Sequence, residues 1–310
     1  HTIAGVQVDG VSVGAVSTYT FPNVTAGHTI AASFTLNSYT ILASAFGGGS
    51  ISPSGTVTVS CGGSQVFTVT PDSCHTNSGI AVDGVNVGVV SSYTFTNVTA
   101  NHTIGAHFSQ NSYTIVASAG PGGSISPSGS LGIDCASTQP YTITPDGCHT
   151  IADVLVDGVS VGAVSTYNFP NVTADHTIAA SFTLKTFTIV ASAGAGGSIS
   201  PSGNVSVNCG ANQAFSITPD GCHTIADVLV DGVSVGAVSS YTFTNVTAGH
   251  TIAASFTLNT YTIVASAGAG GVISPSGNVS VNCGANQAFS ITPNTCNSIA
   301  NVLVDGVSVG

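Results

Sequence analysis

The stretch Thr224-Ile-Ala-Asp-Val-Leu-Val-Asp-Gly-Val-Ser-Val235 decides the fold of this chain. Apolar β-forming residues flank a central Asp231-Gly232 pair, a pattern that predicts a β-hairpin with a two-residue loop. A type I′ turn needs positive φ at both central residues, and Asp-Gly is favoured there for that reason. The same pair recurs in register along the chain, and the predicted structural turns are Asp9, Gly10, Asp83, Gly84, Asp157, Gly158, Asp231, Gly232, Asp305 and Gly306.

This recurrence has a strict 74-residue period (135 − 61 = 74), without an insertion or a deletion. It is set by two cysteine series, Cys61, Cys135, Cys209 and Cys283, and Cys74, Cys148, Cys222 and Cys296. A strict period of this length indicates tandem copies of one small folding unit. We expect residues 1–37 to be the C-terminal half of a repeat, residues 38–111, 112–185 and 186–259 to be full repeats, and residues 260–310 to be the N-terminal part of a repeat.

The phase of the repeat at the two ends gives a further expectation. His1 aligns with His75, just after the second cysteine of a unit, and the sequence closes at Gly310, part of the way through another unit. Each part-repeat would leave apolar faces uncovered by itself. We therefore expect an internal segment of a longer polymer, or a subunit that its neighbours complete.

Each unit carries short strand patterns and no sustained helical period. Within residues 186–259, Phe187–Ser192 and Gln213–Pro219 alternate apolar and polar side chains, and His250–Leu258 places its apolar residues on one side. The pattern predicts about seven short strands in a β-sandwich or barrel. The fold class is therefore all-β, a tandem array of small β-sandwich-like domains with a 74-residue period.

Two features predict how the units connect and turn. The junctions Leu36–Tyr39, Ser109–Tyr113 and Leu184–Phe187 pass from the last strand to the first without Gly or Pro. Flexible tethers are longer and rich in Gly and Ser, so we expect fixed junctions and an elongated rod. The turn before the last strand carries Gly27, Asn101, Asp175 or Gly249, and these residue types predict a left-handed backbone there.

The sparse charge of the chain excludes two classes of partner. Charged residues make up 4%, the formal net charge is −11, and Lys185 is the one cation. Roughly 25% of the residues in an ordinary globular domain are charged. Nucleic-acid binding uses Lys and Arg to displace counterions from phosphates, so we expect no nucleic-acid partner. No apolar run approaches the length that spans a bilayer, so we expect no membrane insertion in this segment.

The cysteines predict disulfides. A unit of this size has little stability to spare from a single core, and an intradomain disulfide would help it. Zinc is the alternative, since Cys61, Cys74 and His75 offer three ligands. The histidine becomes Asn297 in the last copy, however, and no fourth ligand recurs. We predict no metal, an oxidising extracytoplasmic location, and disulfides within the units at Cys61, Cys74, Cys135, Cys148, Cys209, Cys222, Cys283 and Cys296.

Two stretches of each copy are distinctive. In residues 186–259 they read Ile225-Ala-Asp-Val-Leu-Val-Asp-Gly-Val-Ser-Val-Gly236 and Tyr241-Thr-Phe-Thr-Asn-Val-Thr-Ala-Gly-His-Thr-Ile252. Together they resemble the divergent internalin-B-type repeat of long secreted and surface proteins of bacteria and some archaea. The resemblance covers essentially the whole chain. It implies an extracellular stalk, adhesin or fibre module without enzymatic activity and offers no catalytic residues. Paired cysteines depart from that family's pattern.

The Asn-Val-Thr motif raises the possibility of N-glycosylation. Glycans would help so uncharged a surface to stay soluble without edge-to-edge pairing of strands. The structural alternative is that the motif is only the end of a strand that enters a turn. The candidate glycosylation sites are Asn23, Asn97, Asn101, Asn171, Asn204, Asn245 and Asn278.

Three other patterns suggest sites but have structural explanations. The histidine series His28, His102, His176 and His250 gives one histidine per unit beside a turn, which predicts a structural or exposed role. One carboxylate per Asp-Gly turn is far short of the six to eight oxygens that Ca²⁺ requires. The Gly194–Gly197 run resembles a phosphate loop, but a strand is expected next, and phosphate loops lead into a helix.

These observations favour a structural segment of an extracellular filament, built of tandem disulfide-stabilised β repeats. The alternative is the stalk of a cell-surface adhesin, or a module that binds a carbohydrate or receptor. Glu and Arg are absent and each potential catalytic residue type recurs with the repeat, so we expect no enzyme and no cofactor. The expected partner is the protein itself, by end-to-end continuation or polymerisation and by lateral bundling. The expected location is extracellular, at the cell surface.

Overall fold

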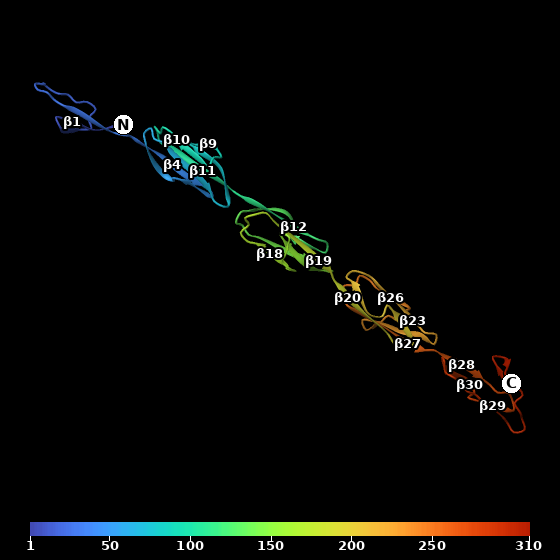
Figure 1. Cartoon of the computed structure of the whole chain (residues 1–310). Coiled ribbons are helices and arrows are strands. Elements are labelled where there is room, and N and C mark those ends of the chain that lie inside the picture. The colour runs from blue at the N-terminus through green and yellow to red at the C-terminus, as the bar shows by residue number, and fades with distance from the viewer. The chain divides into compact units, whose positions relative to one another are not determined.

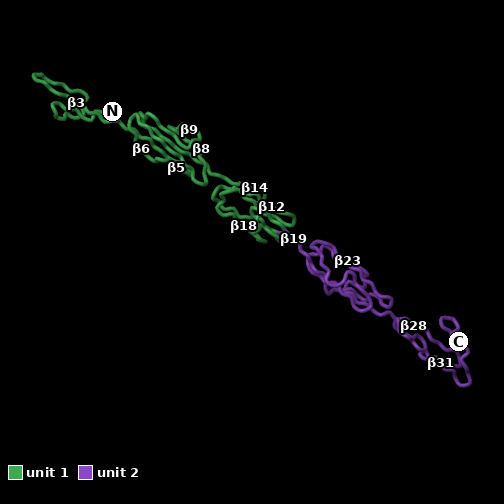
Figure 2. Tube along the Cα trace, in the orientation of Figure 1, with its two compact units in different colours: residues 1–144, 151–181 green, residues 145–150, 182–310 purple.

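The structure, a computed structural model, describes residues 1–310 and contains strands without helices (Figure 1). The predicted all-β class is confirmed. The chain divides into two compact units, residues 1–144 with 151–181, and residues 145–150 with 182–310 (Figure 2).

The first unit begins with a partial repeat and a complete one. The partial repeat contains β1 (Thr2–Val8), β2 (Val11–Gly14) and β3 (Ile30–Thr35). The complete repeat, residues 38–111, contains eight strands rather than the expected seven, β4 (Ser38–Phe46), β5 (Gly49–Ser52), β6 (Gly55–Ser60), β7 (Gln65–Pro71), β8 (His75–Val82), β9 (Val85–Gly88), β10 (Ser92–Phe95) and β11 (His102–Gln110).

Residues 112–185, which belong in part to each unit, repeat the same order of strands. These strands are β12 (Ser112–Ala119), β13 (Gly123–Ser126), β14 (Gly129–Asp134), β15 (Gln139–Pro145), β16 (His149–Val156), β17 (Val159–Ser160), β18 (Thr166–Phe169) and β19 (His176–Leu184).

The second unit holds the last complete repeat and a partial one. The complete repeat consists of β20 (Thr186–Ala193), β21 (Gly197–Ser200), β22 (Gly203–Asn208), β23 (Gln213–Pro219), β24 (His223–Val230), β25 (Val233–Ser234), β26 (Ser240–Phe243) and β27 (His250–Leu258). The partial repeat consists of β28 (Thr260–Ala265), β29 (Gly271–Ser274), β30 (Gly277–Asn282), β31 (Ser290–Pro293), β32 (Leu303–Val304) and β33 (Val307–Ser308).

Each complete repeat is a sandwich of two sheets. In residues 38–111 the larger sheet has the strand order β6-β4-β11-β8-β9 and the smaller one the order β10-β7-β5. The first and last strands of the repeat, β4 and β11, are parallel neighbours. Residues 186–259 form the same pair of sheets, β22-β20-β27-β24-β25 and β21-β23-β26.

One apolar core lies between the two sheets of each sandwich. In residues 186–259 its fully buried members come from both sheets and include Ile189, Phe215, Val228 and Ile252. The equivalent core positions in residues 38–111 are Ile41, Phe67, Ile80 and Ile104. The alternation that predicted half-buried strands therefore places the apolar side chains inward.

In the partial repeats the apolar side chains are not enclosed between two complete sheets. Ile30 and Phe34 of β3 are 54% and 60% exposed, whereas Ile104, the equivalent of Ile30 in β11, is 1% exposed. The reason is that residues 1–37 form the single sheet β2-β1-β3, whereas the sheet that contains β11 is packed against a second sheet, β10-β7-β5.

The two backbone predictions have opposite outcomes. At the hairpin, Asp231 has φ 50° and Gly232 φ 79°, so positive φ at both central residues is confirmed. The left-handed turn predicted at Gly27, Asn101, Asp175 and Gly249 is wrong, because none of these residues has positive φ. Asn101 and Asp175 instead accept hydrogen bonds through Oδ1, from the backbone N–H groups of Thr40 at 2.9 Å and Thr114 at 2.7 Å.

Candidate functional site: the disulfide junctions

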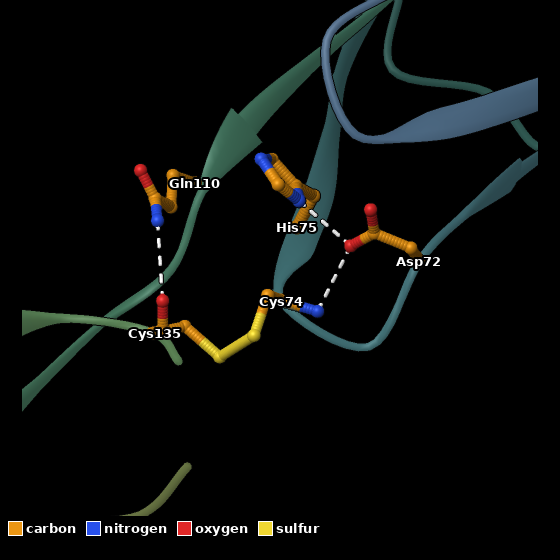
Figure 3. The surroundings of a disulfide bond; sticks show 5 residues. All are labelled: Asp72, Cys74, His75, Gln110 and Cys135. Atoms are coloured by element: carbon orange, nitrogen blue, oxygen red, sulfur yellow. Dashed lines mark hydrogen bonds and ion pairs between the residues drawn. A yellow bond between two sulfur atoms is a disulfide. The ribbon is translucent and has the colours of Figure 1, made fainter. Parts of the chain in front are cut away.

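A disulfide joins each complete repeat to its successor in sequence. Cys74, which follows β7, is bonded to Cys135, which follows β14 in the next repeat (Figure 3). Their Cα atoms are 5.3 Å apart. The same bond recurs one and two periods later, as Cys148–Cys209 and Cys222–Cys283, and the two cysteines of each pair have a sequence separation of 61.

The intradomain pairing predicted from the sequence is therefore wrong, for a geometric reason. Cys61 and Cys74 are the two cysteines of one repeat, and the whole of strand β7 lies between them. Such a strand spans about 23 Å, whereas a disulfide requires Cα atoms about 4.4–6.8 Å apart. The sequence already carried this signal, since a strand was predicted between the two cysteines.

Six of the eight predicted disulfide cysteines are paired, and Cys61 and Cys296 are free. A sequence separation of 61, the value for every bond that forms, gives neither of these two a partner within residues 1–310.

One linker residue at each junction is held by both repeats. The backbone N–H of Asn111 donates to Cys74 O at 2.8 Å, and the N–H of Cys135 donates to Asn111 O at 2.8 Å. In addition, Gln110 Nε2 donates to Cys135 O at 3.2 Å (Figure 3). Lys185 and Asn259 make the same pair of backbone bonds at the next two junctions. The disulfide and these hydrogen bonds together hold the linker between the two repeats in one conformation.

An aspartate organises the turn that carries the first cysteine. Asp72 Oδ1 accepts hydrogen bonds from the backbone N–H of Cys74 at 2.9 Å and from His75 Nδ1 at 2.7 Å (Figure 3). The hydrogen bond from His75 is the main cause that lowers the pKa of Asp72 below its usual value. The same Asp–His contact fixes Cys148 and Cys222 in their turns, through Asp146 with His149 and Asp220 with His223.

The last copy changes both members of this contact together. Asn294 and Asn297 stand where the other copies have the aspartate and the histidine, and they flank Cys296, the cysteine of this series that is free. The Asp–His contact was not predicted, although the Asp-x-Cys-His spacing repeats in three copies.

The zinc alternative loses its central ligand at this site. Cys74 Sγ is bonded to Cys135 Sγ, and Nδ1 of His75 faces Asp72. No group of three or more His, Cys, Asp or Glu side chains is arranged so that it could hold a metal ion.

The second histidine series forms a separate contact with the Asp-Gly hairpins. His102 Nδ1 lies 2.7 Å from Asp83 Oδ2, and the N–H of Thr103 donates to Asp83 Oδ1 at 2.8 Å. These two hydrogen bonds, with that of His102 the larger, lower the pKa of Asp83. The equivalent pairs are His28 with Asp9, His176 with Asp157 and His250 with Asp231. The predicted structural role of these histidines agrees with this geometry, and the aspartate does more than form a turn.

The candidate glycosylation sites all lie on the surface, since Asn23, Asn97, Asn101, Asn171, Asn204, Asn245 and Asn278 are exposed. Asn97 has φ 52°, and Val98 after it is 2% exposed in the core. The Asn-Val-Thr motif therefore forms a left-handed turn that inserts a valine, which is the structural role considered above. Glycosylation remains a prediction.

The glycine run that resembles a phosphate loop has a packing role. A Cβ at Gly196 would overlap the ring of His223, and one at Gly197 would overlap the ring of Phe256. The absence of side chains here lets these two rings pack against the loop. A strand, β21, begins at Gly197, as expected.

Comparisons with known proteins place the chain in no family. No family model matches, and no curated protein matches. Among solved structures, the I9-I11 tandem from titin aligns over 71% of this chain and 97% of its own, at 9% identity and a TM-score of 0.12. The N-terminal four Ig domains of Dscam1 isoform 4.44 align over 72% of this chain and 73% of their own, at 8% identity and a TM-score of 0.12. At these TM-scores the likenesses carry no argument, and the fold class rests on the strands themselves.

No helix of the structure has the length and apolar character needed to cross a membrane.

Proposed function

We propose that this chain is a structural segment of an extracellular filament, in which tandem β-sandwich repeats are joined covalently through disulfides. The observation that carries the proposal is that each disulfide connects successive repeats instead of closing one repeat. A domain that acts alone does not need a fixed junction with its neighbour. A mechanical element does need one, and the disulfide fixes the junction.

The proposed location follows from cysteine chemistry. Disulfides persist in oxidising compartments, outside the cytoplasm. Three of them, repeated at equal spacing, support secretion or surface display. The predicted rod also belongs to this proposal, supported by the linker residues Asn111, Lys185 and Asn259, which are hydrogen-bonded on both sides. So does membership of the internalin-B-type repeats, which rests on the sequence motifs.

The hollow at Thr114 and Asp157 gives no support to the binding-module alternative. It is an open hollow of about 300 Å³, lined by Thr114, Val116, Asp157, Asp175, His176 and Thr177, without a Trp, Tyr or Phe side chain. Carbohydrate sites commonly offer an exposed aromatic face, which this hollow lacks.

The proposed partner is the protein itself. Every complete repeat places its last strand beside its first, as β11 beside β4 and β27 beside β20. In the partial repeats β3 lacks a neighbour of the β4 type, and β28 lacks a neighbour of the β11 type. These two strands are complementary, so repeats from separate copies of residues 1–310 can complete each other.

The direct test is to image native material from the source organism with antibodies against residues 1–310. We expect label on fibres outside the cell. Non-reducing peptide mapping of the labelled fibres should recover Cys148 bonded to Cys209. Label confined to the cytoplasm, or reduced cysteines in the native protein, would contradict the proposal. Tight binding of a glycan or receptor by the chain, without fibres, would favour the adhesin stalk.

A further inference from the structure

The disulfides create a second covalent route along the chain. The main-chain route passes through every residue. The second route leaves the main chain at Cys74, crosses to Cys135, follows the chain to Cys148 and crosses again to Cys209. From Cys209 it follows the chain to Cys222 and crosses a third time, to Cys283. It therefore uses 13 residues of each 74-residue period (148 − 135 = 13; 209 − 135 = 74).

The residues on the short route are already extended. Between Cys209 and Cys222 lies β23, Gln213–Pro219, which is paired with β21 on one side and with β26 on the other. Its inward side chains Phe215 and Ile217 are 1% and 3% exposed. Between Cys135 and Cys148 lies β15, in which Tyr141 and Ile143 are 1% and 2% exposed. The route therefore runs through the central strand of the smaller sheet. Because a strand is already nearly fully extended, tension can lengthen this part of the route only slightly.

We propose that this route carries tension along the chain and shields the rest of each repeat from it. The proposal rests on the proposed function for its biological purpose, because a filament is the setting in which tension arises. Under load the bonds Cys74–Cys135, Cys148–Cys209 and Cys222–Cys283 become taut first, since they close the shorter path. Residues 75–134, 149–208 and 223–282 then lie in closed loops that bear no load.

The two routes differ strongly in the length to which they can be extended. A fully extended residue spans at most ~3.6 Å, so the short route can reach about 47 Å per period, and more than half of it already lies in a strand. Each closed loop, such as residues 149–208, would release roughly 200 Å if its bond were opened. An oxidised repeat is therefore nearly inextensible, whereas a reduced repeat can unravel completely.

Reduction changes the direction in which the repeat is loaded. Without the bonds, force enters residues 186–259 at the start of β20 and leaves at the end of β27. These strands are parallel neighbours, paired from Ile189 with His250 to Ala193 with Ala254. Force on opposite ends of parallel neighbours shears all these pairs at once, so we expect a reduced repeat to resist and then to open in one step.

The test is single-molecule force spectroscopy on the full chain, pulled from its two ends in a Cys61→Ser/Cys296→Ser background. Both cysteines are unpaired in the structure, so the background leaves the three bonds intact. In oxidised molecules, repeats 112–185 and 186–259 should give no unfolding step. After dithiothreitol is added to the same tethered molecules, each should give a step of roughly 200 Å or more, the extended length of the freed loop. This comparison starts from an already folded molecule.

A variant localises the effect. Cys148→Ser with Cys209→Ser should restore roughly 200 Å of releasable length under oxidising conditions and leave the other two closed loops shielded. Equal steps in oxidised and reduced molecules would overturn the proposal, as would an oxidised variant that extends no further than its background. Shielded repeats in a protein that forms no extracellular fibres would contradict the proposed function alone. Fibres whose oxidised chains unravel fully would contradict the load path alone.

Discussion

In four of the five Asp-Gly hairpins the aspartate is hydrogen-bonded to a histidine at or just before the last strand of the repeat, and the contribution of this contact should depend on pH. The N–H of Thr251 and then Nδ1 of His250 are the main causes that lower the pKa of Asp231. A carboxyl whose pKa is lower in the folded state contributes stability at pH values above about 4, and this stability is lost as the pH falls through the folded value. Seven aspartates share this direction of shift.

The variant Asp231→Asn should therefore lower the free energy of unfolding at pH 7 and flatten its decline in acid. We expect a loss of at most about 1 kcal/mol, because an exposed pair is screened by solvent, and the side chain of Asp231 is 48% exposed. Hydrogen exchange of β24 and β27 between pH 3 and pH 7 measures this. Asp305→Asn is the matched control, since Asp305 has the same turn geometry, φ 52°, but the residue equivalent to His250 lies outside residues 1–310. Equal effects at both sites would contradict the role of the histidine.

A second residue-scale prediction concerns Tyr141. Its hydroxyl is buried without a hydrogen-bond partner, at the position that Phe67 and Phe215 occupy in the neighbouring copies. An unsatisfied buried polar group costs roughly 1–3 kcal/mol. Tyr141→Phe should raise the free energy of unfolding by about 1 kcal/mol, measured by denaturant unfolding.

The same variant carries a pH signature. Burial raises the pKa of Tyr141, so its contribution is fully present below about pH 10 and is lost as the pH rises through the folded value. Tyr141→Phe should remove this alkaline loss. Tyr167→Phe is the control, because Tyr167 is only partly buried, and a gain of equal size there would argue against the unsatisfied hydroxyl as the cause.

At the scale of the strands, the glycine run before β21 distinguishes packing from ligand binding. A Cβ on Gly197 would meet the ring of Phe256 and the backbone oxygen of Thr218. We expect Gly197→Ala to cost about 1–3 kcal/mol, the usual range for overpacking. Gly221→Ala, with open space around the new methyl group, should leave stability unchanged or slightly raised. Hydrogen exchange of β23 and β27 reads out both, and equal protection in the two variants would contradict the packing role.

Strand patterns were predictable from the sequence because each strand alternates and each hairpin carries its own turn residues. The Asp-Gly turns are local, so their backbone conformation followed from two residues. The turn at Asn101 was predicted wrongly, because a distant backbone group, the N–H of Thr40, decides what its side chain does. The left-handed residue of that region is Asn97 instead.

The cysteine pairing was also missed, because chain-entropy reasoning favours near partners while the pairing depends on where a strand places its ends. The strand between Cys61 and Cys74 was predicted, and it places the two cysteines beyond opposite ends of β7, which disfavours the near pairing. The contact between Asp72 and His75 could also have been predicted from the sequence, since the two residues are three apart and recur with the period.

At the scale of the whole molecule, the proposed self-association would bring the open sheet edges and the free cysteines of two copies together at one joint. Strand β28 of one copy can pair with β3 of another, in the parallel register that β4 and β11 adopt. Strands β1 and β2 would then occupy the place of the β32–β33 hairpin. In such a joint, Cys296 of the first copy lies one disulfide separation before Cys61 of the second, because residue 1 aligns with residue 297 and Cys61 therefore with position 357 (357 − 296 = 61).

The purified chain should accordingly form a disulfide ladder under mild oxidation, visible on non-reducing gels as multiples of the chain mass of 30.4 kDa. Cys61→Ser and Cys296→Ser should each abolish the ladder while leaving the three internal bonds intact. Mixing the two variants should yield a covalent dimer, since each retains the cysteine that the other lacks. Peptide mapping must find Cys296 bonded to Cys61. Ladders that contain mainly Cys61–Cys61 bonds would indicate random thiol oxidation, because a joint through β28 and β3 brings unlike ends together.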